Sequence, residues 1–175
     1  MILTLLILLI ATHILIQISF HMLNLLKKIL LRKQESEENF YVKQSLEISN
    51  QACLWLYSKF LSCDLFTITN FEDDFEANRD KRCVIVTARV HPGETQASFV
   101  MEHIMDFLVG NSPEAKILRD TFVFKIVPML NPDGVLVGNY RCNLAGVDLN
   151  RQWIDPGKKL HPSIFHTKLV KFFSE

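Results

Sequence analysis

The sequence has neither a paired cysteine motif nor a net charge, two features that would narrow the range of possible functions. The chain has 175 residues with four cysteines, and no two of them form a Cys-x-x-Cys pair. This argues against a disulfide framework or a thiolate zinc site and favours a reducing compartment. Lysine plus arginine and aspartate plus glutamate both number 19, so the formal net charge is zero. Nucleic acid is not an expected partner, because no overall field attracts it.

The composition is that of a folded chain with room for one domain. Hydrophobic residues make up 49% of the sequence, and 13 residues are Phe. Disordered chains lack this much apolar surface, so a packed core is expected. No internal repeat is visible. We expect three segments: an apolar N-terminal segment at 1–33, a linker or stretch of uncertain structure at 34–64, and a folded unit at 65–175.

The long apolar run at residues 2–20 carries no charge. Its length matches a membrane-spanning helix, which needs roughly 20 apolar residues. Basic residues follow it at 27, 28, 32 and 33 and would place the C-terminal part in the cytosol. A membrane anchor is one interpretation, and a stretch outside the native fold is another. A signal peptide fits less well, because no basic residue precedes the run and no Ala-x-Ala follows it.

From residue 65 onward the pattern predicts alternating strands and helices. Strands are expected at 65–69, 83–88 and 122–130, with a short one at 136–142, because these runs are apolar and β-rich. Helices are expected at 95–109, just after Pro113, and at 161–173. In the first helix the expected apolar face is Phe99, Ile104, Phe107 and Leu108. Strand, helix, strand in this order predicts an α/β fold with at least two parallel neighbouring strands.

Polar side chains follow two of these strands where each strand ends. His91 and Glu94 follow the strand at 83–88, and Asn131 and Asp133 follow the strand at 122–130. Carboxyl ends of parallel strands meet at one edge of a sheet, where α/β proteins place their sites. An imidazole and a carboxylate from one tight loop can share a zinc ion, although a catalytic site typically has three protein ligands. Taken alone, this pair is a weak signal and is more typical of an ordinary surface loop with a solvent-facing histidine beside an N-capping glutamate.

Arginines on the irregular segments that follow suggest an anion site beside this edge. The planar guanidinium groups of Arg141 and Arg151 suit a carboxylate or a developing oxyanion. A surface salt bridge is the alternative for either one. Asn150 adds a neutral donor next to Arg151, and Asp148 is expected to fix the loop.

Four motifs together resemble the zinc carboxypeptidases. They are His91-Pro92-Gly93-Glu94-Thr95, Pro128-Met129-Leu130-Asn131-Pro132-Asp133-Gly134-Val135, Gly138-Asn139-Tyr140-Arg141-Cys142 and Asp148-Leu149-Asn150-Arg151-Gln152-Trp153. Within that family the chain resembles the cytosolic carboxypeptidase branch, which trims glutamates from tubulin and other protein tails. The resemblance implies a partial carboxypeptidase-like mixed sheet flanked by helices, preceded here by an apolar N-terminal helix.

The resemblance also implies roles for five residues. His91 and Glu94 match two zinc ligands, and Arg141 matches the arginine that polarises the scissile carbonyl. Asn150 and Arg151 match the pair that binds the free C-terminal carboxylate of the substrate. The expected cofactor is therefore Zn²⁺, and the expected partner is an acidic, tubulin-like C-terminal tail. The expected location is the cytoplasm, with residues 2–20 as a candidate membrane anchor.

The chain departs from the family pattern downstream of these motifs. The family's third ligand, a histidine, and its general base lie after the Asn-Arg motif, and neither is identified here. His161 and His166 fit the following helix instead. We therefore expect the N-terminal part of a catalytic domain, weakly active or inactive alone. The alternatives are a non-catalytic truncated or membrane-tethered fragment, and an aspartoacylase-like zinc deacylase.

Overall fold

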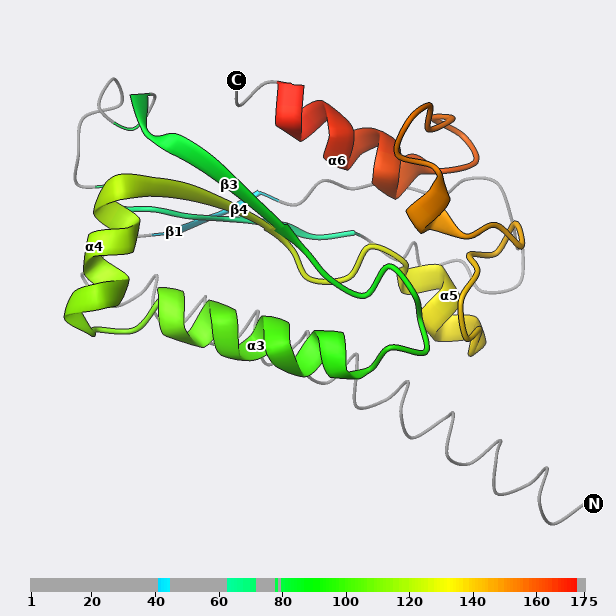
Figure 1. Cartoon of the computed structure of the whole chain (residues 1–175), viewed down its shortest axis with the longest axis horizontal. Coiled ribbons are helices and arrows are strands. Elements are labelled where there is room, and N and C mark those ends of the chain that lie inside the picture. The colour runs from blue at the N-terminus through cyan, green and yellow to red at the C-terminus, as the bar shows by residue number, and fades with distance from the viewer. Residues whose placement is uncertain (1–40, 45–62, 72–77, 79, 173–175) are drawn as a thin grey trace, which may run out of the picture.

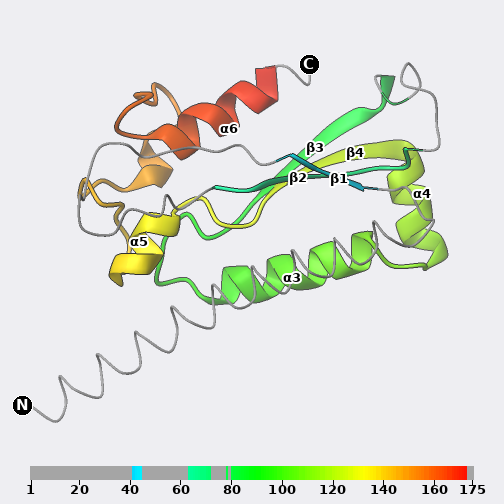
Figure 2. The ribbon, with the colours of Figure 1, turned by 180° about the vertical axis from the view of Figure 1, so that it is seen from behind.

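The computed structural model describes residues 41–44, 63–71, 78 and 80–172. Its elements form a sheet with helices on both faces (Figure 1). Helices α3 and α4 lie on one face and α6 lies on the other, as the view from behind also shows (Figure 2). In chain order the elements are β1 (Tyr41–Gln44), β2 (Leu65–Ile68), β3 (Arg82–Thr87), α3 (Gln96–Leu108), α4 (Pro113–Thr121), β4 (Phe122–Val127), α5 (Pro132–Val137), the 3₁₀ helix η1 (Leu149–Arg151) and α6 (Pro162–Phe172).

The four described strands form one mixed sheet in the order β1-β2-β4-β3. β3 and β4 are parallel, with Arg82 opposite Phe122 at one end and Thr87 opposite Val127 at the other. Parallel neighbours need a long crossover connection, which α3 and α4 provide here. The other two pairings are antiparallel. This confirms the predicted α/β fold with a mixed sheet flanked by helices.

Strict alternation along the strands gives each face of the sheet its own core. Phe66, Ile68, Phe124 and Ile126 face α3 and pack with buried residues of that helix. The alternate positions face the other way, and there Leu65 and Val127 join a second cluster that includes Ile164 of α6. Period-two alternation with both faces apolar is expected for strands covered by helices on both sides.

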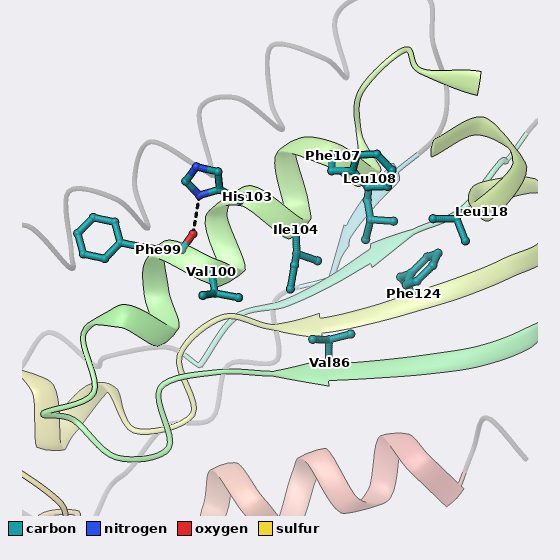
Figure 3. Close-up of a pocket in the computed structure, with 9 residues that line it drawn as sticks. All are labelled: Val86, Phe99, Val100, His103, Ile104, Phe107, Leu108, Leu118 and Phe124. Carbon is teal, nitrogen blue, oxygen red and sulfur yellow. Dashed lines mark hydrogen bonds between the residues drawn. The ribbon is translucent and has the colours of Figure 1, made fainter. Parts of the chain in front are cut away.

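The predicted apolar face of α3 is wrong for its two phenylalanines. Phe99 and Phe107 are 47% and 48% exposed, whereas Met101, Met105 and Leu108 are buried. The two methionines and Leu108 follow the helical spacing on the side that meets the sheet. Between this helix and the sheet, an apolar groove of about 640 Å³ opens beside Phe99 and Phe107 (Figure 3).

Two further predictions need correction. The short strand expected at 136–142 is absent, because Pro132–Val137 forms α5. The Asn131 side chain caps that helix by accepting the Gly134 N–H, and Gly138 ends it with a φ of 80°. In addition, the apolar run in β3 is typical of a buried strand, but its residues after the exposed Arg82 are only partly buried. Within the described part of the chain β3 pairs with β4 alone.

In the N-terminal part of the chain, the structure describes only residues 41–44 before residue 63. The segment of uncertain structure at 34–64 contains β1, which sequence reasoning missed. The apolar run at 2–20 and the helix expected there lie outside the described residues. Among the helices that the structure describes, none combines the length and the apolar character that crossing a bilayer demands.

Candidate metal centre and substrate site

The loops that follow β3 and β4 meet at one edge of the sheet, as the parallel pairing predicts. The ladder continues past both strands, since Leu130 N–H donates to the Ala88 carbonyl at 3.0 Å. The buried Asn131 amide Nδ2 donates to the Val90 carbonyl at 3.2 Å. The carbonyl that precedes His91 is therefore held by the neighbouring loop. The predicted convergence of the two loops is confirmed.

Glycines allow these segments to pack without space between them. A Cβ at Gly93 would lie 2.5 Å from Tyr140 Cδ2, and one at Gly134 would lie 2.5 Å from Pro92 Cγ. Real Cβ atoms do not come this close, so any side chain at either position would force a shift. The Gly93 N–H also donates to the Tyr140 carbonyl at 2.7 Å. The loop carrying His91 is thus clamped between α5 and the segment that carries Arg141.

His91 lies between two carboxylates. Its Nδ1 is 2.9 Å from Glu94 Oε1, and its Nε2 is 3.1 Å from Asp148 Oδ1. The imidazole is buried, whereas Glu94 is partly open to solvent. A neutral imidazole has one N–H and can donate to only one of two carboxylates. The second nitrogen then faces an oxygen lone pair, and a metal cation held between Nδ1 and Glu94 would remove that repulsion.

Asp148 connects the imidazole to the predicted arginine. Its Oδ1 accepts the Asn150 N–H at 2.9 Å and so caps η1, while its Oδ2 accepts Arg141 Nε at 2.8 Å. Partial burial alone would raise the pKa of Asp148. The Asn150 N–H, His91 and Arg141 outweigh that effect, and the net pKa lies below the ordinary value. Asp148 therefore stays ionised and orients two site residues at once.

The structure brings all five predicted site residues onto the segments around this edge. Arg141 is 44% exposed, and its ion pair uses Nε, which leaves both Nη groups outside that contact. Asn150 accepts the Trp153 indole N–H through Oδ1 at 3.1 Å, so its Nδ2 donors point elsewhere. Arg151 is exposed next to Asn150. Among the described residues no hydrogen bond or ion pair engages its guanidinium.

The donors around His91 fit part of a zinc site. Imidazole nitrogen and carboxylate oxygen are both zinc donors, and His91 Nδ1 and Glu94 Oε1 face one another. A metal-ligating histidine typically donates its other N–H to a carboxylate, which is how Nε2 meets Asp148. Within the described ranges no group of three or more His, Cys, Asp or Glu residues could hold a metal. Two ligands and their supporting carboxylate are therefore present, and a third ligand is not identified there.

The two later histidines have structural contacts. His161 is buried, and its Nδ1 accepts the Gly157 N–H at 3.1 Å just before α6. The His166 ring packs edge-on against Phe165 on the same helix. Both contacts agree with the expectation that these histidines belong to the helix.

Sequence reasoning gave Asp148 only a loop-fixing role and did not single out Arg89 or Ser98. The position of Asp148 just ahead of Asn150 and Arg151 was a usable signal, because a carboxylate near candidate ligands is a natural orienting group. Arg89 lies two residues before His91 and is buried, and Ser98 is buried in the first turn of α3. No pattern in the sequence indicates that these two side chains meet.

Comparison with known proteins places the chain in a family. The model of the zinc carboxypeptidase family matches residues 43–168. The chain belongs to that family, and its relatives place it in the cytosolic carboxypeptidase branch. The sheet edge that carries His91, Glu94 and Arg141 lies within the matched residues.

Two relatives and one solved structure show how much is shared. The chain is 51% identical over 111 residues to human cytosolic carboxypeptidase 4, which covers 61% of this chain and 10% of that protein. It is 51% identical over 114 residues to mouse cytosolic carboxypeptidase 6, and this match covers 64% of this chain and 21% of that protein. A metallo-carboxypeptidase from Burkholderia cenocepacia superposes with a TM-score of 0.65 at 28% identity, over 78% of this chain and 34% of that one. The chain thus spans about a tenth to a fifth of the length of these relatives.

Proposed function

We propose that this sheet edge is the zinc- and carboxylate-binding part of a metallocarboxypeptidase site that acts on the C-terminal tails of proteins. The observation that carries the proposal is the continuous set of contacts from Glu94 through His91 and Asp148 to Arg141. It combines two zinc donors with an arginine held in place by the carboxylate that also orients the histidine. Family membership supports the same reaction class.

Each proposed role follows from the position of the side chain. His91 and Glu94 would hold the zinc ion, which at such sites polarises a carbonyl oxygen and activates water. Arg141 would donate its exposed Nη groups to the scissile carbonyl oxygen as negative charge develops there. Arg151 and the Asn150 amide would bind the substrate's terminal carboxylate. An internal peptide bond offers no such carboxylate, so this pair would select chain ends.

Glutamate as the residue removed, and an acidic tubulin-like tail as partner, remain part of the proposal. The named relatives are cytosolic carboxypeptidases, which supports action on protein tails in the cytoplasm. A role of residues 2–20 as a membrane anchor is a separate prediction. Fractionation of cells that express the chain with and without these residues tests it, and equal recovery in the soluble fraction would contradict it.

A zinc titration of the 175-residue chain tests the metal site. We expect weak binding, because two protein ligands hold zinc less tightly than three. His91→Ala and Glu94→Ala should each abolish it, whereas the exposed Glu114→Ala, in the first turn of α4, should leave it unchanged. Binding that survives both ligand substitutions would contradict the assignment.

Binding of two matched peptides tests the carboxylate site. One peptide ends in glutamate with a free α-carboxylate, and the other carries a C-terminal amide. We expect tighter binding of the free acid in calorimetry and loss of that preference in Arg151→Ala, with Arg82→Ala at the far end of β3 as control. Equal binding of the two peptides would overturn the role of Arg151. Hydrolysis of acyl-amino acids in place of peptides would favour a deacylase.

A further inference from the structure

Arg89 occupies an unfavourable position just before the metal-binding loop. It lies two residues before His91, only 3% of its surface is exposed, and its φ is 54°. A left-handed backbone is unfavourable for a residue with a Cβ, and burial of a cationic side chain is also unfavourable. Burial correspondingly lowers the pKa of this guanidinium. Hydrogen-bond contacts of the guanidinium oppose both effects.

Those contacts reach both sides of Glu94. Arg89 Nε donates to the Pro92 carbonyl at 2.9 Å, and its Nη1 donates to Ser98 Oγ at 2.6 Å. Pro92 follows His91 directly, and Ser98 lies in the first turn of α3. The rigid, planar guanidinium therefore connects the loop to α3, the helix that follows it. A lysine could not make the same two contacts, because it lacks the fixed geometry of the guanidinium fork.

A second buried arginine shows what a purely structural role looks like. Arg119 is 6% exposed, and its Nη1 donates to the Leu108 and Gly110 carbonyls at 2.6 and 2.8 Å. These carbonyls lie at the C-terminal end of α3, about 20 Å from its N-terminal end at 1.5 Å per residue. Burial and contacts resemble those of Arg89, but Arg119 lies at the opposite end of the helix from His91.

We propose that Arg89 is a positioning residue, which holds the Pro92–Glu94 segment so that the Glu94 carboxylate faces His91 Nδ1. This inference rests on the proposed function, in which that pair binds zinc. Because Arg89 is buried, it acts through the loop and does not touch substrate. The left-handed residue lies between the last ladder contact at Ala88 and the loop, and the guanidinium holds the turn that follows.

Arg89→Gly is the most informative variant. Glycine adopts a positive φ without strain, so the change removes the side-chain contacts and relaxes the backbone. Ser98→Ala removes the contact with α3 and keeps the arginine. Arg119→Lys is the matched control, because it disturbs the other buried arginine. Each variant of the 175-residue chain is examined by urea unfolding, by zinc titration and by ¹⁵N NMR of the histidine imidazoles without metal.

We expect Arg89→Gly to weaken zinc binding about tenfold, the lower end of the effect of changing groups that orient metal ligands. It should also shift the His91 imidazole signals, which His91→Ala identifies. Ser98→Ala should act in the same direction by a smaller factor. Arg119→Lys should lower the urea midpoint and leave both the zinc affinity and the His91 signals unchanged.

Two results would overturn the inference: unchanged His91 signals in Arg89→Gly, or equal effects of Arg89→Gly and Arg119→Lys on zinc affinity at similar stability. A parent chain that binds no zinc through His91 would instead overturn the proposed function. In that case the metal-free imidazole signals still decide whether Arg89 positions the loop.

Discussion

The face of the sheet that packs against α3 and the edge that carries His91 are built by different interactions. The face is apolar, with Phe66, Ile126 and Met105 almost fully buried. At the edge, the buried groups include Asn131 and His91, which are held by directional hydrogen bonds. Apolar packing depends mainly on volume, whereas a hydrogen-bonded cluster depends on the direction of each donor.

Substitutions in these two regions should therefore affect different properties, namely the stability of the fold and the arrangement of the candidate site. A change in the apolar face removes buried surface and lowers the free energy of unfolding. A change at the edge leaves most of that surface in place and alters where the candidate ligands point. Each substitution below should therefore move one property more than the other, and any that moves both equally would weaken the comparison.

The largest effect on stability is expected from Met105→Ala. Met105 is 1% exposed in the cluster between α3 and the sheet, and truncation of such a side chain costs about 2–5 kcal/mol. Urea unfolding at equilibrium measures this loss. The His91 imidazole signals of the remaining folded protein should not change. A shift of those signals comparable to that in Arg89→Gly would show that the face and the edge are not separate.

Among substitutions that keep both candidate zinc ligands, Asp148→Ala should have the largest effect at the edge. It removes the carboxylate that accepts from both His91 and Arg141. Loss of such an orienting group typically weakens metal binding by about 10–100-fold. Zinc titration measures the change, with the exposed Asp155→Ala as control. Zinc affinity equal to that of the parent chain would contradict the role of Asp148 in orienting His91.

Acid should reduce the contribution of Asp148 to stability. The folded pKa of this carboxyl lies below its ordinary value of 3.8, so its contribution is present above about pH 4 and is lost as the pH falls through the folded pKa. The difference in urea midpoint between the parent chain and Asp148→Ala should be constant from pH 5 to 7 and shrink below pH 4. A difference that grows in acid would contradict this sign.

The smallest effect is expected from Phe99→Ser. Phe99 is 47% exposed and lies beside the groove rather than in the buried cluster. Exposed substitutions typically change stability by no more than about 0.5 kcal/mol. A loss in urea unfolding close to that of Met105→Ala would show that the groove belongs to the core.

The sequence was sufficient for β2, β3 and β4, for α3, α4 and α6, and for the convergence of the two candidate loops. Apolar runs with β-branched residues predicted β2, β3 and β4, and the order of strand and helix predicted the parallel pair. The convergence of His91 and Glu94 with Asn131 followed from that pairing alone. These inferences succeed because the spacing of apolar residues can be read directly from the sequence. The parallel direction of β3 and β4 then determines which strand ends lie together.

The sequence did not predict contacts between residues that only the folded structure brings together. The buried side of α3 was predicted from its phenylalanines, but the sheet meets the methionine side instead. The apolar residues at 136–142 favour a strand, but the caps at Asn131 and Gly138 make residues 132–137 a helix. The contact of Arg89 with Ser98 and the double role of Asp148 depend on distances that no spacing predicts.

The close packing of Gly93 against Tyr140 links the candidate metal loop to an aromatic ring that is 77% exposed. A side chain at position 93 would have to displace this ring or the loop. The backbone next to Glu94 can therefore lie directly beneath an exposed aromatic ring only because residue 93 is a glycine.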